Sequence, residues 1–511
     1  MLLAMRCAPL LLIGLLLLGE SADAAPQSRG TAWPFGSTTA GRGRDLYNLG
    51  LIGAKASDNV RGEPEAAGSG RFEVNPDERF DDDGPEELRI ELLFPDGPAQ
   101  SAGLAIGDVI VGVGGRNFDG GCFEDLAEAL SKATSKDGEL KLRVRRQGEG
   151  SVERVELTLP VLGRELSDPT DADARQILGT NALNWLAEKQ LDSGGFRETL
   201  SGNNGAVVMT CIAGLGWLAG GSSLEEGPHA AQLAKAVEFV DAFLAQPSGM
   251  GGGASPGGAN WDQTNWGLAH AAIFLGELHE RGANEEVRAS LQRAATLITE
   301  RQEASGGWAH GPGGPNALGY LELNIVSGLC LSGLGLALRA GCEVDEDKVE
   351  LADEYIEASS SGGGVGYSDR DGQVGQGNIG RSAATWLGYV NLGMGRSGRG
   401  KQLASYVQRN VSDVQGGHAS LMQHIFLAGV AAAAHGRGAS RSYWEAMEFD
   451  LVLALTPDGS LQPRPWHESL SMRSNSDVSV GDVWTTACWA CVLLADPARD
   501  GSSGLPAWCG Q

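Results

Sequence analysis

The 511-residue sequence predicts a multidomain protein: an N-terminal α+β unit followed by an all-α (α/α)6 toroid, a closed ring of six helical hairpins. A glycine-rich turn recurs six times in the C-terminal two-thirds. Each turn follows an amphipathic helical stretch and precedes a nearly uncharged one. Such self-similarity identifies a repeat architecture better than any single residue does. One glycine per turn marks the repeat, with steps of 57, 55, 57, 53 and 42 residues: Gly195, Gly252, Gly307, Gly364, Gly417 and Gly459.

The first residues have the layout of a secretory signal peptide. Arg6 supplies the positive region, Leu10 to Leu18 the apolar core, and Ala22-Asp23-Ala24 a small-residue cleavage site. The apolar core is short for a membrane span, and no later stretch is long and apolar enough to span either. We therefore expect a signal peptide at residues 1–24, a linker at 25–40, and a secreted or periplasmic mature chain.

Composition limits the partners. Apolar residues make up 42% of the chain, enough for large cores, and the formal net charge of −26 argues against nucleic-acid backbones and anionic membranes. Seven cysteines follow the predicted signal, at scattered spacings that form no disulfide framework. Cys488 and Cys491 have CxxC spacing but lie in an apolar helical stretch, so we expect buried thiols and no metal or cofactor. Pairing of Cys342 with Cys330 or Cys509 stays open.

Residues 41–163 alternate short strands with helices. Strands are expected at 48–57, 88–94, 108–115, 140–146 and 152–159, a short helix at 97–104, and an amphipathic helix at 122–134. An acidic insertion at 57–87 includes the run RFDDDGPEE. It is expected to be an exposed loop, because such a composition buries too little apolar surface to order itself.

Residues 97–115 (GPAQSAGLAIGDVIVGVGG) resemble the G-P-A-x-x-A-G-L-x-x-G-D-x-I-x-x-V-x-G stretch of PDZ domains of the bacterial, protease-associated type. Asn48-Leu49-Gly50-Leu51 is similar to that family's carboxylate-binding loop. The resemblance implies that a peptide adds as a strand after the loop, whose N–H groups receive the peptide's C-terminal carboxylate. The peptide-binding residues it implies are Leu49, Gly50, Leu51, Ile52, Phe123 and Leu126, with Ala127 beside them. The alternative is a PDZ fold that serves as a spacer or docking surface.

The helical half follows a polar linker at 164–175 and spans residues 176–498, leaving a tail at 499–511. Amphipathic stretches with mixed charge, such as 182–190, 230–246 and 287–302, are expected on the outside. The nearly uncharged stretches that follow the turns are apolar on all faces. Such a helix is a buried one, so we expect these stretches on the inside. The predicted inner helices are 207–220, 267–278, 323–338, 383–395, 421–434 and 483–495.

The turns at 190–196 and 302–308 resemble the Q-x-x-x-G-G-F/W turn of the α/α toroids found in squalene and terpene cyclases, protein prenyltransferase β-subunits and some polysaccharide lyases. The pairing of a PDZ-like unit with such a toroid resembles a family of secreted bacterial proteins that has no assigned activity. These resemblances imply an architecture far better than a chemistry.

Polar and aromatic residues collect at the turns and at the starts of the predicted inner helices, where unpaired N–H groups give a partial positive charge. We expect a ligand-binding rim there, with Tyr367, His310, His418 and Arg381 as catalytic candidates. The alternative is that Trp and Asn fasten the turns to the ring while His caps helices. The ligand rim comprises Trp261, Asn265, Trp266, Trp308, Asn378, His424, Trp466, Asp482 and Trp484.

Two functions remain after the known toroid chemistries are tested against the sequence. The helical half has no Asp-x-Asp-Asp acid for polyene cyclisation, no fitting zinc set and no Gly-Cys-Gly-Glu-Gln thioester motif. The first hypothesis is an exported binding protein whose PDZ module recognises a peptide or C-terminus and whose toroid holds a ligand, such as a small molecule or glycan, or a partner. The second is a secreted carbohydrate lyase or hydrolase, and terpene cyclisation is a less favoured enzyme activity. Convergence of Tyr367, Arg381, His310 and His418 in an open pocket would favour the enzyme; separate pairing with backbone would favour binding.

Overall fold

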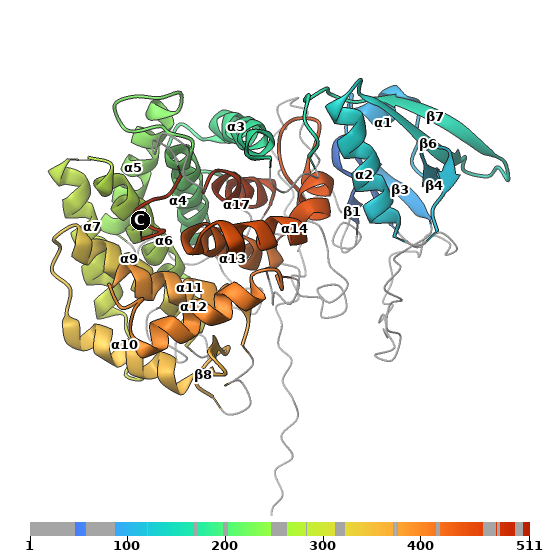
Figure 1. Cartoon of the computed structure of the whole chain (residues 1–511). Helices are drawn as coiled ribbons and strands as arrows, with labels where there is room; N and C mark the ends of the chain where they lie inside the picture. The colour runs from blue at the N-terminus through green and yellow to red at the C-terminus, as the bar shows by residue number, and fades with distance from the viewer. Residues whose placement is uncertain are drawn as a thin grey trace, which may run out of the picture.

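The computed structural model shows a two-part architecture, with a sheet-rich unit at residues 47–158 and a helical half after it (Figure 1). The predicted signal peptide, the first linker and most of the acidic insertion lie outside the described residues. Within the described part of the chain, no helix is both long and apolar enough to cross a bilayer. The residues that the structure describes are 46–57, 87–119, 121–166, 171–197, 203–246, 263–282, 284–311, 322–370, 374, 377–414, 420–462, 477, 481–495 and 504–510.

The N-terminal unit is an antiparallel sheet in the order β1-β2-β3-β4-β6-β7, with β5 paired to β4. Period-2 burial of β6, where Leu140, Leu142 and Val144 are buried, matches a sheet with one face on a core. The buried face of α2 contributes Leu126 and Leu130 to that core. The elements are β1 (Tyr47–Asn48), β2 (Ala54–Ser57), β3 (Leu88–Leu93), α1 (Pro98–Ser101), β4 (Val109–Val113), β5 (Arg116–Asn117), α2 (Cys122–Ser135), β6 (Glu139–Arg145) and β7 (Val152–Thr158).

The single strand expected at 48–57 is wrong. The chain instead forms β1, a 3-10 turn at Gly50–Ile52, and then β2. Gly50 and Gly53 have φ values of +65° and +73°, a left-handed conformation that breaks a strand and that glycine adopts without steric cost. The two short strands therefore fold back on one another, and β1 pairs with β2.

The helical half alternates outer and inner helices as the repeat predicts. The inner helices are buried nearly all round; every residue of α9 from Asn324 to Ala337 is buried. The outer helices are α3 (Ala172–Lys189), α5 (Ala230–Ala245), α7 (Glu285–Glu300), α10 (Glu346–Ala358), α12 (Gly398–Asn410) and α14 (Arg437–Ala454). The inner helices are α4 (Asn203–Ala219), α6 (Thr264–Glu280), α9 (Asn324–Arg339), α11 (Ile379–Asn391), α13 (Leu421–His435) and α17 (Asp482–Leu494).

The inner helices contact one another in cyclic order. Helix α4 packs on α6, α6 on α9, α9 on α11, α11 on α13, α13 on α17, and α17 returns to α4 (Figure 1). Each outer helix packs mainly on the inner helix of the preceding repeat, and α3 packs on α17 in the same way. The first and last repeats are therefore in contact through both sets of helices. A short hairpin, β8 (Ser360–Ser361) with β9 (Gly364–Val365), forms the turn before α11.

The glutamine of the Q-x-x-x-G-G turn joins neighbouring repeats. Gln302 Nε2 donates to Gly306 O in its own turn and to Lys348 O in the next outer helix, α10, both at 2.8 Å. One amide thus links a carbonyl of its own turn to a carbonyl in the first turn of the next outer helix. Gln190 Nε2 makes the equivalent bonds to Gly194 O at 2.8 Å and to Gln232 O at 3.0 Å.

The first glycine of the same turn is required by backbone geometry and by space. Gly306 has φ +96°, and a Cβ there would lie 2.1 Å from Leu351 O in α10. Gly194 has φ +87°, and its Cβ would lie 2.0 Å from Lys235 O in α5. No side chain fits at either position, because a neighbouring backbone carbonyl already occupies the space.

The described cysteines form no disulfide with one another, and all of them are buried: Cys122, Cys211, Cys330, Cys342, Cys488, Cys491 and Cys509. Burial raises the pKa of the Cys488 and Cys491 thiols well above the usual range, and the Cys491 thiol donates to Ile212 O at 3.0 Å. These two thiols are therefore small packed side chains, as their apolar surroundings predicted.

Candidate functional site

The loop predicted to bind a peptide carboxylate lies between the two parts of the chain. Residues 49–52 are buried, and the last turn of α14 covers them (Figure 1). Asn48 Nδ2 donates to Leu453 O at 2.6 Å and to Leu455 O at 3.0 Å. A Cβ added at Gly50 would lie 2.7 Å from Val452 O, so the loop backbone touches the helix backbone. The loop is thus a contact surface for the helical half.

The edge of β2 beside this loop is already paired. Tyr47 of β1 lies opposite Ala56, and Asn48 lies opposite Lys55. The Tyr47 ring packs 4.7 Å from the ring of Phe123 in α2, and both Phe123 and Leu126 are buried. A peptide strand cannot add to a β2 edge that β1 occupies. The described geometry favours the docking-surface alternative, and peptide binding stays a prediction.

Charged groups are buried where the two parts meet. Lys55 of β2 is 9% exposed, and its Nζ donates to Gln462 Oε1 at 3.1 Å. Burial lowers the pKa of Lys55 to about 8, against the attraction of Asp482 at the start of α17. Burial raises the pKa of Asp482 to about 6, although a hydrogen bond from the Val483 N–H opposes this shift.

Three further side chains lie beside Lys55, Gln462 and Asp482: Asp458, Trp185 and Lys189. We call these six residues the junction cluster. Trp185 Nε1 donates to Asp458 Oδ2 at 3.0 Å, and the Lys189 amine lies 5.1 Å from the centre of the Trp185 ring. Asp458 and Lys189 both act on the pKa of Asp482. The sequence analysis singled out Asp482 alone, because its partners come from the sheet unit, from α3 and from the turn after α14.

Two of the predicted rim asparagines bind the turn of the next repeat. Asn265 of α6 donates from Nδ2 to Ala309 O at 3.0 Å and from its backbone N–H to His310 O at 3.1 Å. Asn324 of α9 makes the equivalent bonds to Gly366 O at 2.9 Å and Tyr367 O at 3.1 Å. Each amide leaves a buried Oδ1 without a hydrogen-bond partner among the described residues. Asparagine here has the fastening role that was the alternative to ligand binding.

Trp266 forms hydrogen bonds with two histidines, and we call the three residues the Trp266 cluster. Its Nε1 donates to His310 Nδ1 at 2.8 Å, and its carbonyl accepts from His270 Nδ1 at 2.8 Å. The three rings stack, with Trp266 centred 6.1 Å from His310 and 6.5 Å from His270. Burial lowers the pKa of His270 and of His310 to about 4, so both imidazoles are neutral at pH 7. His270 Nε2 is buried and has no hydrogen-bond partner in the described structure.

A buried cation lies at the start of α11. Arg381 is 8% exposed, and its Cζ lies 5.5 Å from the centre of the Tyr367 ring. Burial lowers the pKa of Arg381 to about 10, opposed by Tyr367 and Tyr406. Asn378 caps the helix by accepting from the Gly380 and Arg381 N–H groups at 2.9 and 3.4 Å. The rim therefore brings Tyr367 and Arg381 together, and His310 belongs to the Trp266 cluster instead.

The remaining rim predictions divide into core residues and positions outside the described part. Trp308 is fully buried and donates to Ile298 O at 2.8 Å, and Trp484 donates to Asp477 Oδ1 at 3.0 Å. His424 is buried against α11, where a Cβ on Gly380 would lie 2.2 Å from its Nδ1. Trp261, His418 and Trp466 lie outside the described residues. The sequence analysis missed His270, which lies one helical turn after Trp266, and Tyr406, which lies on the outer helix α12 with no rim residue within a turn of it.

Residues 218–494 match the family model described as a domain of unknown function, DUF6288. The match covers more than half of the chain. The chain belongs to the DUF6288 family. No curated protein matches the sequence.

The DUF6288 match begins near the end of α4 and ends with α17. It therefore contains Arg381, Tyr367, the Trp266 cluster and Asp482, and it excludes Lys55. The rim residues belong to the DUF6288 region, whereas the junction cluster is completed from outside it.

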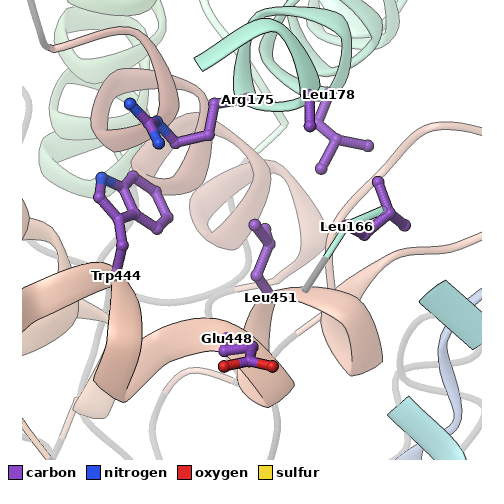
Figure 2. Close-up of a pocket in the computed structure, with 7 residues that line it drawn as sticks. Leu166, Arg175, Leu178, Trp444, Glu448 and Leu451 are labelled. Atoms are coloured by element: carbon purple, nitrogen blue, oxygen red, sulfur yellow. The ribbon is translucent and has the colours of Figure 1, made fainter. Parts of the chain in front are cut away.

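A separate small pocket lies between α3 and α14 (Figure 2). The Arg175 guanidinium lies 5.1 Å from the centre of the Trp444 ring. Apart from Arg175 and Glu448 its lining is apolar, which offers few groups to orient a polar ligand. Across the described ranges, no group of three or more His, Cys, Asp or Glu side chains could hold a metal ion. The pocket is lined by Leu166, Ala174, Arg175, Leu178, Trp444, Glu448 and Leu451.

Proposed function

We propose that the chain is an exported binding protein whose helical half is an (α/α)6 toroid that holds a hydroxyl-rich, carboxylate-bearing ligand, a uronate-type glycan, at the N-terminal ends of its inner helices. The cyclic order of contacts from α4 round to α17 supports the toroid. The signal-peptide layout of residues 1–24 supports export.

The observation that carries the ligand class is the burial of Arg381 at the first turn of α11. An arginine guanidinium is planar and presents a fork of N–H donors. Here the Tyr367 ring lies against its face, and the fork of N–H donors is suited to bind a carboxylate with two parallel hydrogen bonds. The N-terminus of α11 adds partial positive charge beside it.

Unsatisfied polar atoms on the same end of the ring support a ligand with hydroxyl groups. Asn265 Oδ1, Asn324 Oδ1 and His270 Nε2 are buried acceptors, and Gln423 Nε2 is a buried donor, with no hydrogen-bond partner among the described residues. Buried polar groups are nearly always satisfied in folded proteins, so these four atoms are the ones that a ligand at this end would complete. Sugar hydroxyls both donate and accept, and therefore match this set.

We further propose that the PDZ-like unit acts as a docking module fixed to the ring. The bonds from Asn48 to the end of α14, the buried Lys55–Gln462 contact and the pairing of β1 on β2 support this role. The docked unit contributes Lys55 to the junction cluster on the helical half.

The experiment is calorimetric binding of uronate oligosaccharides and of neutral oligosaccharides of the same length. We expect uronate binding, and Arg381→Gln should weaken it at least tenfold, because a charge-assisted bidentate contact is lost. Arg409→Gln is the matched control, since Arg409 is an exposed arginine of α12 that contacts Ser405. Equal binding by the wild type and Arg381→Gln, or equal affinity for neutral sugars, would refute the ligand class.

The alternative function is a lyase acting on the same ligand class, favoured by the position of the Tyr367 ring against Arg381. A tyrosine base beside a cation that neutralises the sugar carboxylate suits proton abstraction next to that carboxylate. Release of unsaturated uronate, followed by its ultraviolet absorbance, is the test. Turnover that Tyr367→Phe abolishes without weakening binding would establish the enzyme over the binding protein.

A further inference from the structure

The C-terminal segment 504–510 lies at the end of the ring opposite the rim. The chain terminus is seen among the helices in Figure 1, and the segment forms one helical turn closed by Cys509 N–H donating to Leu505 O at 2.9 Å. Its side chains Leu505, Ala507, Trp508 and Cys509 are all buried. The segment predicted to be a tail is therefore packed inside, where the inner helices end.

Side chains from three inner helices bind the backbone of this segment. Glu277 Oε2 of α6 accepts from the Trp508 N–H at 2.8 Å, and Asn391 Nδ2 of α11 donates to Trp508 O at 3.0 Å. Arg339 Nη1 of α9 donates to Ala507 O at 2.7 Å. At the other end, Arg281 donates to Gly504 O, and the Gly504 N–H donates to Ala219 O of α4 at 2.9 Å. The helices thus bind main-chain N–H and C=O groups along the segment, which contains no charged side chain.

Glu277 shows why this end is suited to bind a peptide. Its side chain has 0% exposure, and its ion pair with Arg281 on the same helix has an Nε–Oε1 distance of 3.1 Å. Burial raises the pKa of Glu277, opposed by Arg281 and by the Trp508 N–H. A carboxylate in an apolar interior is strongly disfavoured unless donors surround it, and the segment supplies one of them.

Trp508 supplies the apolar anchor. Its side chain is fully buried, and its ring lies 5.5 Å from the ring of Phe426 in α13. Buried Trp side chains are enriched among the residues that contribute most of the binding energy of protein contacts. Small neighbours, Ala507 and Gly510, let the segment enter; a Cβ on Gly510 would lie 2.1 Å from Val390.

We propose that the C-terminal ends of the inner helices form a peptide-binding site, and that its occupant is the chain's own C-terminal segment, residues 504–510. The site recognises a short segment with one tryptophan between small residues, through Glu277, Arg281, Arg339 and Asn391. The inference does not depend on which ligand the rim holds.

The test uses the full chain with a protease site inserted between residues 499 and 500, cleaved after the protein has folded. Gel filtration then measures retention of the released fragment. Fluorescence polarisation measures its exchange for a labelled synthetic peptide GLPAWCGQ, residues 504–511, under reducing conditions. We expect the fragment to be retained and to exchange with the labelled peptide. A peptide with alanine in place of Trp508 should bind about a hundredfold more weakly, because the anchor is lost.

Glu277→Gln provides the second measurement. It keeps the shape of the side chain and removes its charge, so labelled-peptide affinity should fall about tenfold. Glu300→Gln, at an exposed position of α7, should leave affinity unchanged. Three results would overturn the proposal: release of the fragment without rebinding of peptide, retention without any exchange, or unfolding of the ring when the fragment leaves. The last two would make the segment an integral part of the fold.

Discussion

Replacement of Lys55 by methionine is expected to stabilise the protein. In the folded chain burial lowers the pKa of Lys55 from 10.5 to about 8. Between these values the unfolded chain binds a proton that the folded chain does not, so stability is greatest above pH 10.5 and falls as the pH falls toward 8. Each pKa unit corresponds to about 1.4 kcal/mol, which gives a cost of about 3 kcal/mol at pH 8.

Methionine removes this cost but loses two favourable contacts. The hydrogen bond from Lys55 Nζ to Gln462 Oε1 contributes about 1 kcal/mol, and the attraction of Lys55 for Asp482 is lost with it. Methionine has a similar length and adapts to irregular packing, so little strain is added. The expected net gain in the free energy of unfolding at pH 8 is about 1–2 kcal/mol.

The assay is equilibrium urea unfolding of wild type and variant at pH 8.0 and pH 9.5. From pH 8.0 to pH 9.5 the free energy of unfolding of the wild type should rise by about 1.5 kcal/mol more than that of Lys55→Met. The difference arises because the variant lacks the Lys55 amine and every other titratable group is the same. Lys136→Met, at an exposed position of the same unit, should follow the wild type. A variant that is less stable than wild type at pH 8, or that keeps the full pH dependence, would refute the assignment of Lys55 as a destabilising buried amine.

Two predictions concern the repeat turns. Gly306→Ala should lower the free energy of unfolding by about 3 kcal/mol or more, because the residue combines φ +96° with a Cβ 2.1 Å from Leu351 O. Gly341→Ala, with φ +73° and nothing within 4 Å of its Cβ, should cost only about 1 kcal/mol; similar losses for the two would contradict the steric argument. Gln302→Ala should cost about 1–3 kcal/mol, since the two hydrogen bonds that link its turn to α10 are lost. Gln402→Ala, on the exposed side of α12, should stay within about 0.5 kcal/mol of wild type in the same denaturation assay. A Gln302→Ala value in that range would refute the role of Gln302 in joining neighbouring repeats.

The sequence by itself determined the local structure of this protein. Whether a segment is a strand, an amphipathic helix or an all-apolar helix follows from the spacing of its own residues, and the described elements confirm the two-part order. The Gln-x-x-x-Gly-Gly turns were equally visible, because the motif recurs and the positive φ of its first glycine is a property of the turn itself. The carbonyl that excludes a Cβ there comes from the next outer helix and is visible only in the structure. The one strand predicted wrongly, 48–57, failed where two glycines with positive φ turn the chain back on itself.

Only the tertiary structure decided which groups meet. Lys55 and Gln462 lie 407 residues apart, and Asn48 reaches α14 over a similar separation, so no periodicity relates them. The same holds for the rim, where Tyr367 and Arg381 come together while His310 is taken by Trp266. Burial and pKa shifts depend on desolvation by distant segments of the chain. A local pattern records which face of an element is apolar, but the partner that covers the face is chosen by the packing of the whole chain.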